Sequence, residues 1–158
     1  MSGATFDDMR DLYQEVILDH GRNPRHAKRL DDFDSTAKGD NPMCGDRVQV
    51  WLKFTPAGAI AATGFEARGC AISVASADLM AETVQGRDPA DTRALFAAFR
   101  DMARTGTCPA CDAALTEPME RLAPLSGVHE YPSRVKCATL PWHALIAALD
   151  GTKETSSE

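Results

Sequence analysis

The fold is decided by residues 44–70, which read CGDRVQVWLKFTPAGAIAATGFEARGC. Apolar residues occupy every second position over 47–54, a pattern typical of a strand with one buried face. Residues 55–58 predict a turn, and residues 59–67 predict a strand that returns beside the first. Antiparallel neighbours joined by this turn bring both ends of the stretch to the same edge of the sheet. Cys44 and Asp46 stand at one end and Cys70 at the other, so we expect these side chains at the same edge.

The rest of the chain supplies one more strand and several helices. Apolar residues recur at helical spacing in four stretches, and Thr116 and Pro118 open a further short helix. We expect helices over 7–19, 70–85, 88–105, 117–123 and 133–150, a kink at Pro141, a short strand over 33–38 and a loop over 127–132. The fold class is therefore α+β, with a small antiparallel three-stranded sheet packed against several α-helices. We expect a single domain over 1–151 and a disordered C-terminal tail over 152–158.

Composition excludes several classes of protein. The chain has 158 residues, of which 44% are hydrophobic and 25% charged, as in globular proteins with one core. Its net charge of −6 argues against a nucleic-acid partner, and no apolar run is long enough to cross a membrane. The N-terminus lacks the apolar core of a signal peptide, so we expect a cytoplasmic protein with reduced thiols. The odd count of five cysteines favours metal or thiol chemistry over disulfides.

Four residues from three separate stretches could form one metal site. Cys44 and Asp46 flank Gly45 in a predicted turn, where a glycine lets both side chains face one centre. Cys70 stands at the start of a predicted helix, where the helix dipole favours the thiolate form. With Cys137, these residues supply three thiolates and one carboxylate, a set that can complete a tetrahedral site. Each cysteine taken alone is more often a small buried apolar residue than a metal ligand.

Two further features allow more than one interpretation. Cys108 and Cys111 form a Cys-x-x-Cys motif, which could be an uninvolved loop, a redox pair or an accessory metal site. Residues 22–29 are rich in arginine and lysine. They are either a solvated loop after the first helix or a contact for an acidic partner.

Four motifs occur in order along the chain. They are LYQEVILDH at 12–20 with RNP at 22–24, NPMCGD at 41–46, GCAIS at 69–73 and RVKCA at 134–138. Together they resemble the SufU branch of the IscU/NifU-N iron–sulfur assembly proteins, over nearly the whole chain. Lys136 stands where the IscU scaffold branch has a histidine, and the long interval between Cys70 and Cys137 resembles the insertion of the SufU branch.

The resemblance implies a fold, a metal and an activity. The fold would be SufE/NifU-like, and Cys44, Asp46, Cys70 and Cys137 would bind Zn²⁺. The protein would be a sulfurtransferase that accepts persulfide sulfur on Cys44 from a SufS-type cysteine desulfurase, which supplies a histidine to zinc and frees that cysteine. The sulfur would then pass to a SufBCD-type assembly complex.

The residues next to the site suggest one more role and leave two alternatives. We expect Arg134 to assist sulfur acceptance, and both Arg134 and Lys136 to offset the negative charge of the site. A scaffold that holds a nascent iron–sulfur cluster on the same residues is one alternative, because thiolates bind both occupants. A purely structural zinc domain is the other.

Overall fold

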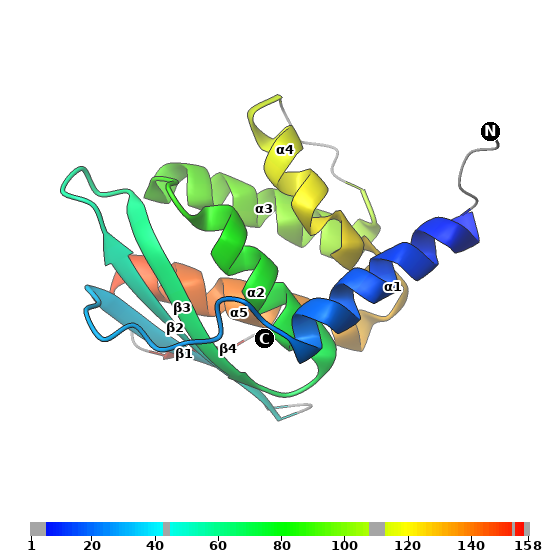
Figure 1. Cartoon of the computed structure of the whole chain (residues 1–158), viewed down its shortest axis with the longest axis horizontal. Coiled ribbons are helices and arrows are strands. Elements are labelled where there is room, and N and C mark those ends of the chain that lie inside the picture. The colour runs from blue at the N-terminus through cyan, green and yellow to red at the C-terminus, as the bar shows by residue number, and fades with distance from the viewer. Residues whose placement is uncertain (1–5, 43–44, 108–112, 153, 157–158) are drawn as a thin grey trace.

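A computed structural model describes residues 6–42, 45–107, 113–152 and 154–156 of the chain (Figure 1). The helices and strands, in chain order, are α1 (Phe6–Arg22), β1 (Ser35–Asn41), β2 (Asp46–Phe54), β3 (Ile60–Arg68), α2 (Ala71–Val84), α3 (Pro89–Thr105), α4 (Ala113–Leu122), the 3₁₀ helix η1 (Ala123–Glu130), α5 (Pro132–Asp150) and β4 (Glu154–Ser156). The predicted α+β class is confirmed, since these described parts of the chain contain three antiparallel strands in one sheet and five α-helices.

The strands form one sheet in the order β3-β2-β1-β4. β2 pairs antiparallel with both β1 and β3, as the alternation in the hairpin predicts. The short strand β4 pairs parallel with β1, so that Glu154–Ser156 lies beside Lys38, Gly39 and Asp40. The expectation of a disordered tail over 152–158 is therefore corrected for these three residues. These residues pair with a free sheet edge through their backbone. Their side chains are polar, so the sequence has no pattern that would predict this strand.

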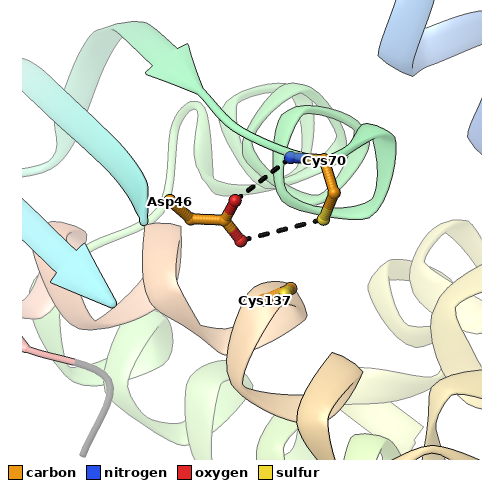
Figure 2. A group of neighbouring side chains, drawn as sticks. All are labelled: Asp46, Cys70 and Cys137. Atoms are coloured by element: carbon orange, nitrogen blue, oxygen red, sulfur yellow. Dashed lines mark hydrogen bonds between the residues drawn. The ribbon is translucent and has the colours of Figure 1, made fainter. Parts of the chain in front are cut away.

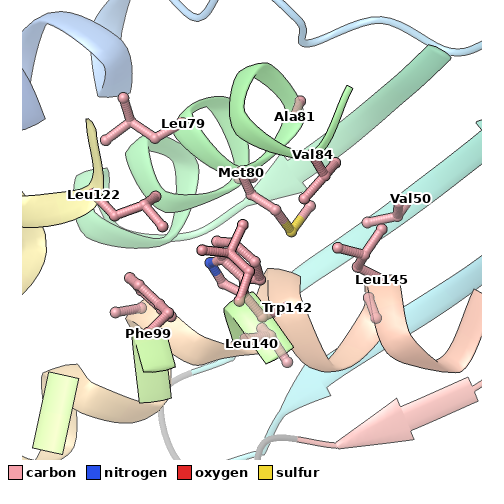
Figure 3. Close-up of a cluster of buried hydrophobic side chains, with 14 of the residues drawn as sticks. Val50, Leu79, Met80, Ala81, Val84, Phe99, Leu122, Leu140, Trp142 and Leu145 are labelled. Atoms are coloured by element: carbon pink, nitrogen blue, oxygen red, sulfur yellow. The ribbon is translucent and has the colours of Figure 1, made fainter. Parts of the chain in front are cut away.

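The helices gather on one face of the sheet (Figure 1). α2 and α5 pack directly against the strands, and α1 lies along α2. The core between these layers contains Val50 from β2, several aliphatic residues of α2, and aromatic residues of α3 and α5 (Figure 3). Within it the rings of Phe99 and Trp142 stack with their centroids 4.8 Å apart. This core fixes the ends of α2 and α5 relative to the sheet edge.

The opposite face of the sheet is covered in part by the segment that follows α1. The backbone of Lys28 passes over Gly64 so closely that a Cβ there would lie 2.2 Å from the Lys28 carbonyl oxygen. The guanidinium of Arg29 lies 5.7 Å from the ring centroid of Trp51. Trp51 is therefore only 2% exposed, although it points away from the helices. Part of the basic stretch 22–29 thus covers the sheet.

Several element boundaries differ from the sequence prediction. α1 and α4 are longer than expected, and the predicted loop over 127–132 is largely the 3₁₀ helix η1. α5 continues through Pro141, which has no amide hydrogen to donate to the carbonyl of Cys137. Packing of α5 against the sheet and α2 compensates for that missing bond.

Candidate metal centre

Asp46 opens strand β2 at the edge where β1 and β2 are joined. It pairs with Asn41 across the hairpin, and the backbone amide of Gly45 donates to the Asn41 carbonyl oxygen at 2.8 Å. Gly45 has a φ of +76°, a left-handed conformation that glycine adopts without steric cost. This turn directs Asp46 toward the helices, where the residue is 2% exposed. A buried carboxylate requires hydrogen-bond donors or a cation.

Cys70 meets Asp46 at the same sheet edge. β3 ends beside the start of β2, where Arg68 pairs with Arg47, so the hairpin prediction is confirmed. Cys70 is the N-cap of α2 and its backbone amide donates to Oδ1 of Asp46 at 3.1 Å. Its Sγ lies 3.7 Å from Oδ2 of the same carboxylate (Figure 2). Asp46 therefore satisfies the first amide of the helix and also contacts the thiol.

Gly69 makes this contact sterically possible. Its φ is +147°, and a Cβ at this position would lie 2.0 Å from Oδ1 of Asp46. The sequence pattern around Gly69 predicts only that a strand ends there and a helix begins. This close contact could have been predicted from the sequence, since a glycine directly before a candidate metal-binding cysteine indicates close approach of another group.

Cys137 completes a three-residue cluster from the α5 side. It lies in the second turn of α5, is 1% exposed, and its Sγ is 3.6 Å from the Ser133 carbonyl oxygen. One ligand atom from each of Asp46, Cys70 and Cys137 lies within 4.8 Å of the other two. Ligand atoms of tetrahedral zinc are about 3.5 Å apart, given metal–ligand bonds of about 2.0–2.3 Å. The cluster therefore fits a zinc ion after a small contraction.

Arg134 lies beside the two thiols of the cluster. A side-chain hydrogen bond to Cys137 and the charge of Cys70 raise the pKa of its guanidinium above its ordinary value. The side chain is exposed, so the cation stands at the mouth of the cluster. It offsets negative charge there without being a metal ligand, because a guanidinium has no free lone pair.

Three of the four predicted ligands are thus brought together by β2, α2 and α5. The fourth, Cys44, lies outside the described residues, and so do Cys108 and Cys111. Cys44 is two residues from Asp46 in sequence, and Gly45 between them is in the left-handed turn. The sequence places Cys70 at the start of a helix, but it does not predict the bond from the Cys70 amide to Asp46.

The model of the NifU-like N-terminal domain matches residues 12–138, which include Asp46, Cys70 and Cys137. The chain belongs to the family of NifU-like N-terminal domains. This NifU-like domain is 35% identical over 134 residues to the zinc-dependent sulfurtransferase SufU of Bacillus subtilis (strain 168), covering 85% of this chain and 86% of that protein. It is 33% identical over 138 residues to the iron–sulfur cluster assembly scaffold protein IscU of Streptococcus pyogenes serotype M1, covering 87% and 82%.

Solved structures share the fold. One is a putative iron–sulfur cluster assembly scaffold protein for the SUF system from Fervidobacterium islandicum AW-1, with a TM-score of 0.75 and 29% identity over 89% of this chain and 98% of that one. The resemblance to the IscU/NifU-N proteins is thereby confirmed at the level of family and fold. Among the described residues, no helix is both long and apolar enough to span a bilayer.

Proposed function

We propose that this NifU-like domain is a zinc-dependent sulfurtransferase, which accepts persulfide sulfur from a cysteine desulfurase for iron–sulfur cluster assembly. The convergence of Asp46, Cys70 and Cys137 is the observation that carries the proposal. The relative from Bacillus subtilis, which is named a zinc-dependent sulfurtransferase, gives independent support. We place the protein in the cytoplasm, with a SufS-type desulfurase as donor and a SufBCD-type complex as acceptor.

Zinc would be held by Cys44, Asp46, Cys70 and Cys137. Bound zinc keeps cysteine side chains as thiolates and has no redox chemistry of its own. Asp46 is the one oxygen ligand among softer sulfur ligands. This mixed ligand set would exchange a ligand on zinc more readily than a site of four thiolates would. Cys70 and Cys137 are anchored by α2 and α5.

Cys44 is the proposed sulfur acceptor, because it adjoins the glycine turn and the other two cysteines belong to helices. Its thiolate attacks the terminal sulfur of the desulfurase persulfide, and a new S–S bond forms. The S–S bond of the donor breaks, and the donor cysteine leaves as a thiolate. No oxidant is required, since one S–S bond replaces another. The cation of Arg134 attracts the anionic donor persulfide to the thiols.

The test is labelling with a cysteine desulfurase and free cysteine, followed by peptide mass spectrometry. We expect the added sulfur on the peptide that carries Cys44, and we expect Cys44→Ser to abolish stimulation of the desulfurase. A double variant of Cys108 and Cys111 to serine is the matched control and should retain stimulation. Sulfur on the Cys108/Cys111 peptide, together with an active Cys44→Ser variant, would contradict the assignment.

A scaffold for a nascent iron–sulfur cluster is the second candidate. It is favoured by the 33% identity to the scaffold protein of Streptococcus pyogenes and by the same cluster of thiols. The protein purified without oxygen distinguishes the two functions. One zinc per chain supports sulfur transfer, whereas iron with labile sulfide supports the scaffold.

A further inference from the structure

Ser73 carries a buried hydroxyl that has no hydrogen-bond partner. The residue lies in the first turn of α2 and is 0% exposed. The other buried hydroxyls of the described helices each donate to a carbonyl oxygen: Ser76 to Ala138, Thr83 to Leu79, Thr92 to Asp88 and Thr139 to Val135. A buried hydroxyl without an acceptor costs about 1–3 kcal/mol, so its presence at this position calls for a partner.

The start of α2 explains why Ser73 has no acceptor within its own helix. A buried helical hydroxyl usually donates to the carbonyl four residues back. For Ser73 that residue is Gly69, which precedes the N-cap and has a φ of +147°. The Gly69 carbonyl therefore lies outside the helical hydrogen-bond ladder. The carbonyl three residues back, that of Cys70, accepts from the Val74 amide and not from Ser73, so the acceptor for Ser73 has to come from elsewhere.

Ser73 follows the candidate ligand Cys70 by one helical turn. It is the third helical residue after the N-cap Cys70, and a side chain at this position extends back toward the N-cap. The Cys70 amide is already bonded to Asp46. One turn further along α2, Ser76 donates to Ala138, the residue that follows Cys137. Ser73 thus lies on α2 between the N-cap Cys70 and Ser76, the residue that contacts α5 next to Cys137.

We infer that the Ser73 hydroxyl donates a hydrogen bond to a metal-bound sulfur of the cluster, on Cys70 or Cys137. A metal-bound cysteine is a thiolate, which accepts hydrogen bonds more strongly than a thiol does. The hydroxyl therefore gains its partner when the metal binds. Ser73 is a positioning residue that strengthens metal binding and withdraws electron density from the bound thiolate sulfur. This inference rests on the metal site of the proposed function.

The test compares Ser73→Ala with the control Ser76→Ala, whose hydroxyl already has an acceptor. Zinc affinity is measured by competition with a chromophoric chelator, and folding by circular dichroism. We expect Ser73→Ala to weaken zinc binding about tenfold, as loss of such supporting hydrogen bonds does. The metal-free variant should be as stable as the wild type or more stable, because it loses an unpaired buried hydroxyl. Ser76→Ala should lower metal-free stability and leave zinc affinity unchanged.

Cobalt in place of zinc supplies a readout that a purely structural role would not move. Loss of a hydrogen bond to a thiolate shifts the sulfur-to-cobalt charge-transfer band to lower energy, and we expect this shift in Ser73→Ala alone. An unchanged zinc affinity and an unchanged band in Ser73→Ala overturn the inference while the metal site stands. If the wild-type protein binds neither zinc nor cobalt, both this inference and the metal site of the proposed function are overturned.

Discussion

Replacement of Gly69 by alanine tests the geometry that joins Asp46 to Cys70. The added Cβ would lie 2.0 Å from Oδ1 and 2.6 Å from Cγ of Asp46. These atoms cannot yield easily, because the carboxylate is held by the amide of Cys70 at 3.1 Å. The substitution must therefore displace Asp46, distort the backbone, or do both.

The expected loss of stability has two parts. Alanine at a φ of +147° is strained, which costs about 1–3 kcal/mol. Displacement of Asp46 leaves the Cys70 amide without its acceptor, which costs about a further 1–3 kcal/mol. The control is Gly58→Ala, because Gly58 has a φ of +93° and no atom within 4 Å of an added Cβ. The control variant should lose only the stability that backbone strain costs.

The assay is chemical denaturation of both variants in the presence of a metal chelator, followed by zinc titration. Gly69→Ala should lose about 1–3 kcal/mol more unfolding free energy than Gly58→Ala, the share assigned to the lost hydrogen bond. Only Gly69→Ala should bind zinc more weakly, since only it displaces Asp46. Equal stability of the two variants, with wild-type zinc affinity in both, would refute the reasoning.

Other perturbations have defined outcomes. Asp78, which is fully buried, accepts hydrogen bonds from the amides of Arg25 and His26 at 2.8 Å each and from the ring of His20. Asp78→Ala should lower the unfolding free energy by about 3 kcal/mol or more in denaturant titrations, because it leaves these donors without an acceptor. Removal of zinc by a chelator should lower the melting temperature by several degrees in a scanning fluorescence assay, because metal binding couples β2, α2 and α5. Arg134→Ala should slow persulfide acceptance in single-turnover labelling while zinc stays bound.

Matched controls and contrary results accompany each of these predictions. Asp88→Ala removes an exposed helix cap and should lower the unfolding free energy by only about 1 kcal/mol. An equal loss for Asp78→Ala would contradict the claim that Asp78 serves several hydrogen-bond donors. An unchanged melting curve after verified metal removal would argue against a convergent site. Arg121, which pairs with Glu117 away from the cluster, is the control for Arg134. Loss of zinc in Arg134→Ala would show that the residue maintains the site rather than attracting sulfur.

Acidification should destabilise the fold in part through His143. Burial, and then the nearby charge of Arg100, lower the pKa of this imidazole below its ordinary value of 6.5. The unfolded chain therefore binds the proton more readily than the folded one. The associated stability is present above about pH 6.5 and is lost as the pH falls below that value. His143→Phe should flatten this part of the pH profile, and an equally steep profile would count against the assignment.

Local signals in the sequence identified most elements of the fold. Alternation over 47–54 and the turn at 55–58 predicted the hairpin, because a strand with one buried face has period two. The same hairpin predicted that Asp46 and Cys70 would meet, since antiparallel strands return to their starting edge. Helical spacing and terminal glycines predicted the helices, although their limits differ by several residues.

Contacts between distant segments decided the rest. Trp51 alternates with buried residues in sequence, yet Lys28 and Arg29 cross the outer sheet face and cover it. No periodicity within β2 can indicate a segment that lies more than twenty residues earlier in the chain. β4 is likewise formed only because β1 offers a free edge. The approach of Cys137 to Asp46 depends on how α5 packs against the sheet and α2, and spacing along the chain does not specify that packing. Sequence thus indicated the candidate ligands and the cation of Arg134 beside them, and the tertiary structure decided that Asp46, Cys70 and Cys137 converge and that Asp46 lies against Gly69.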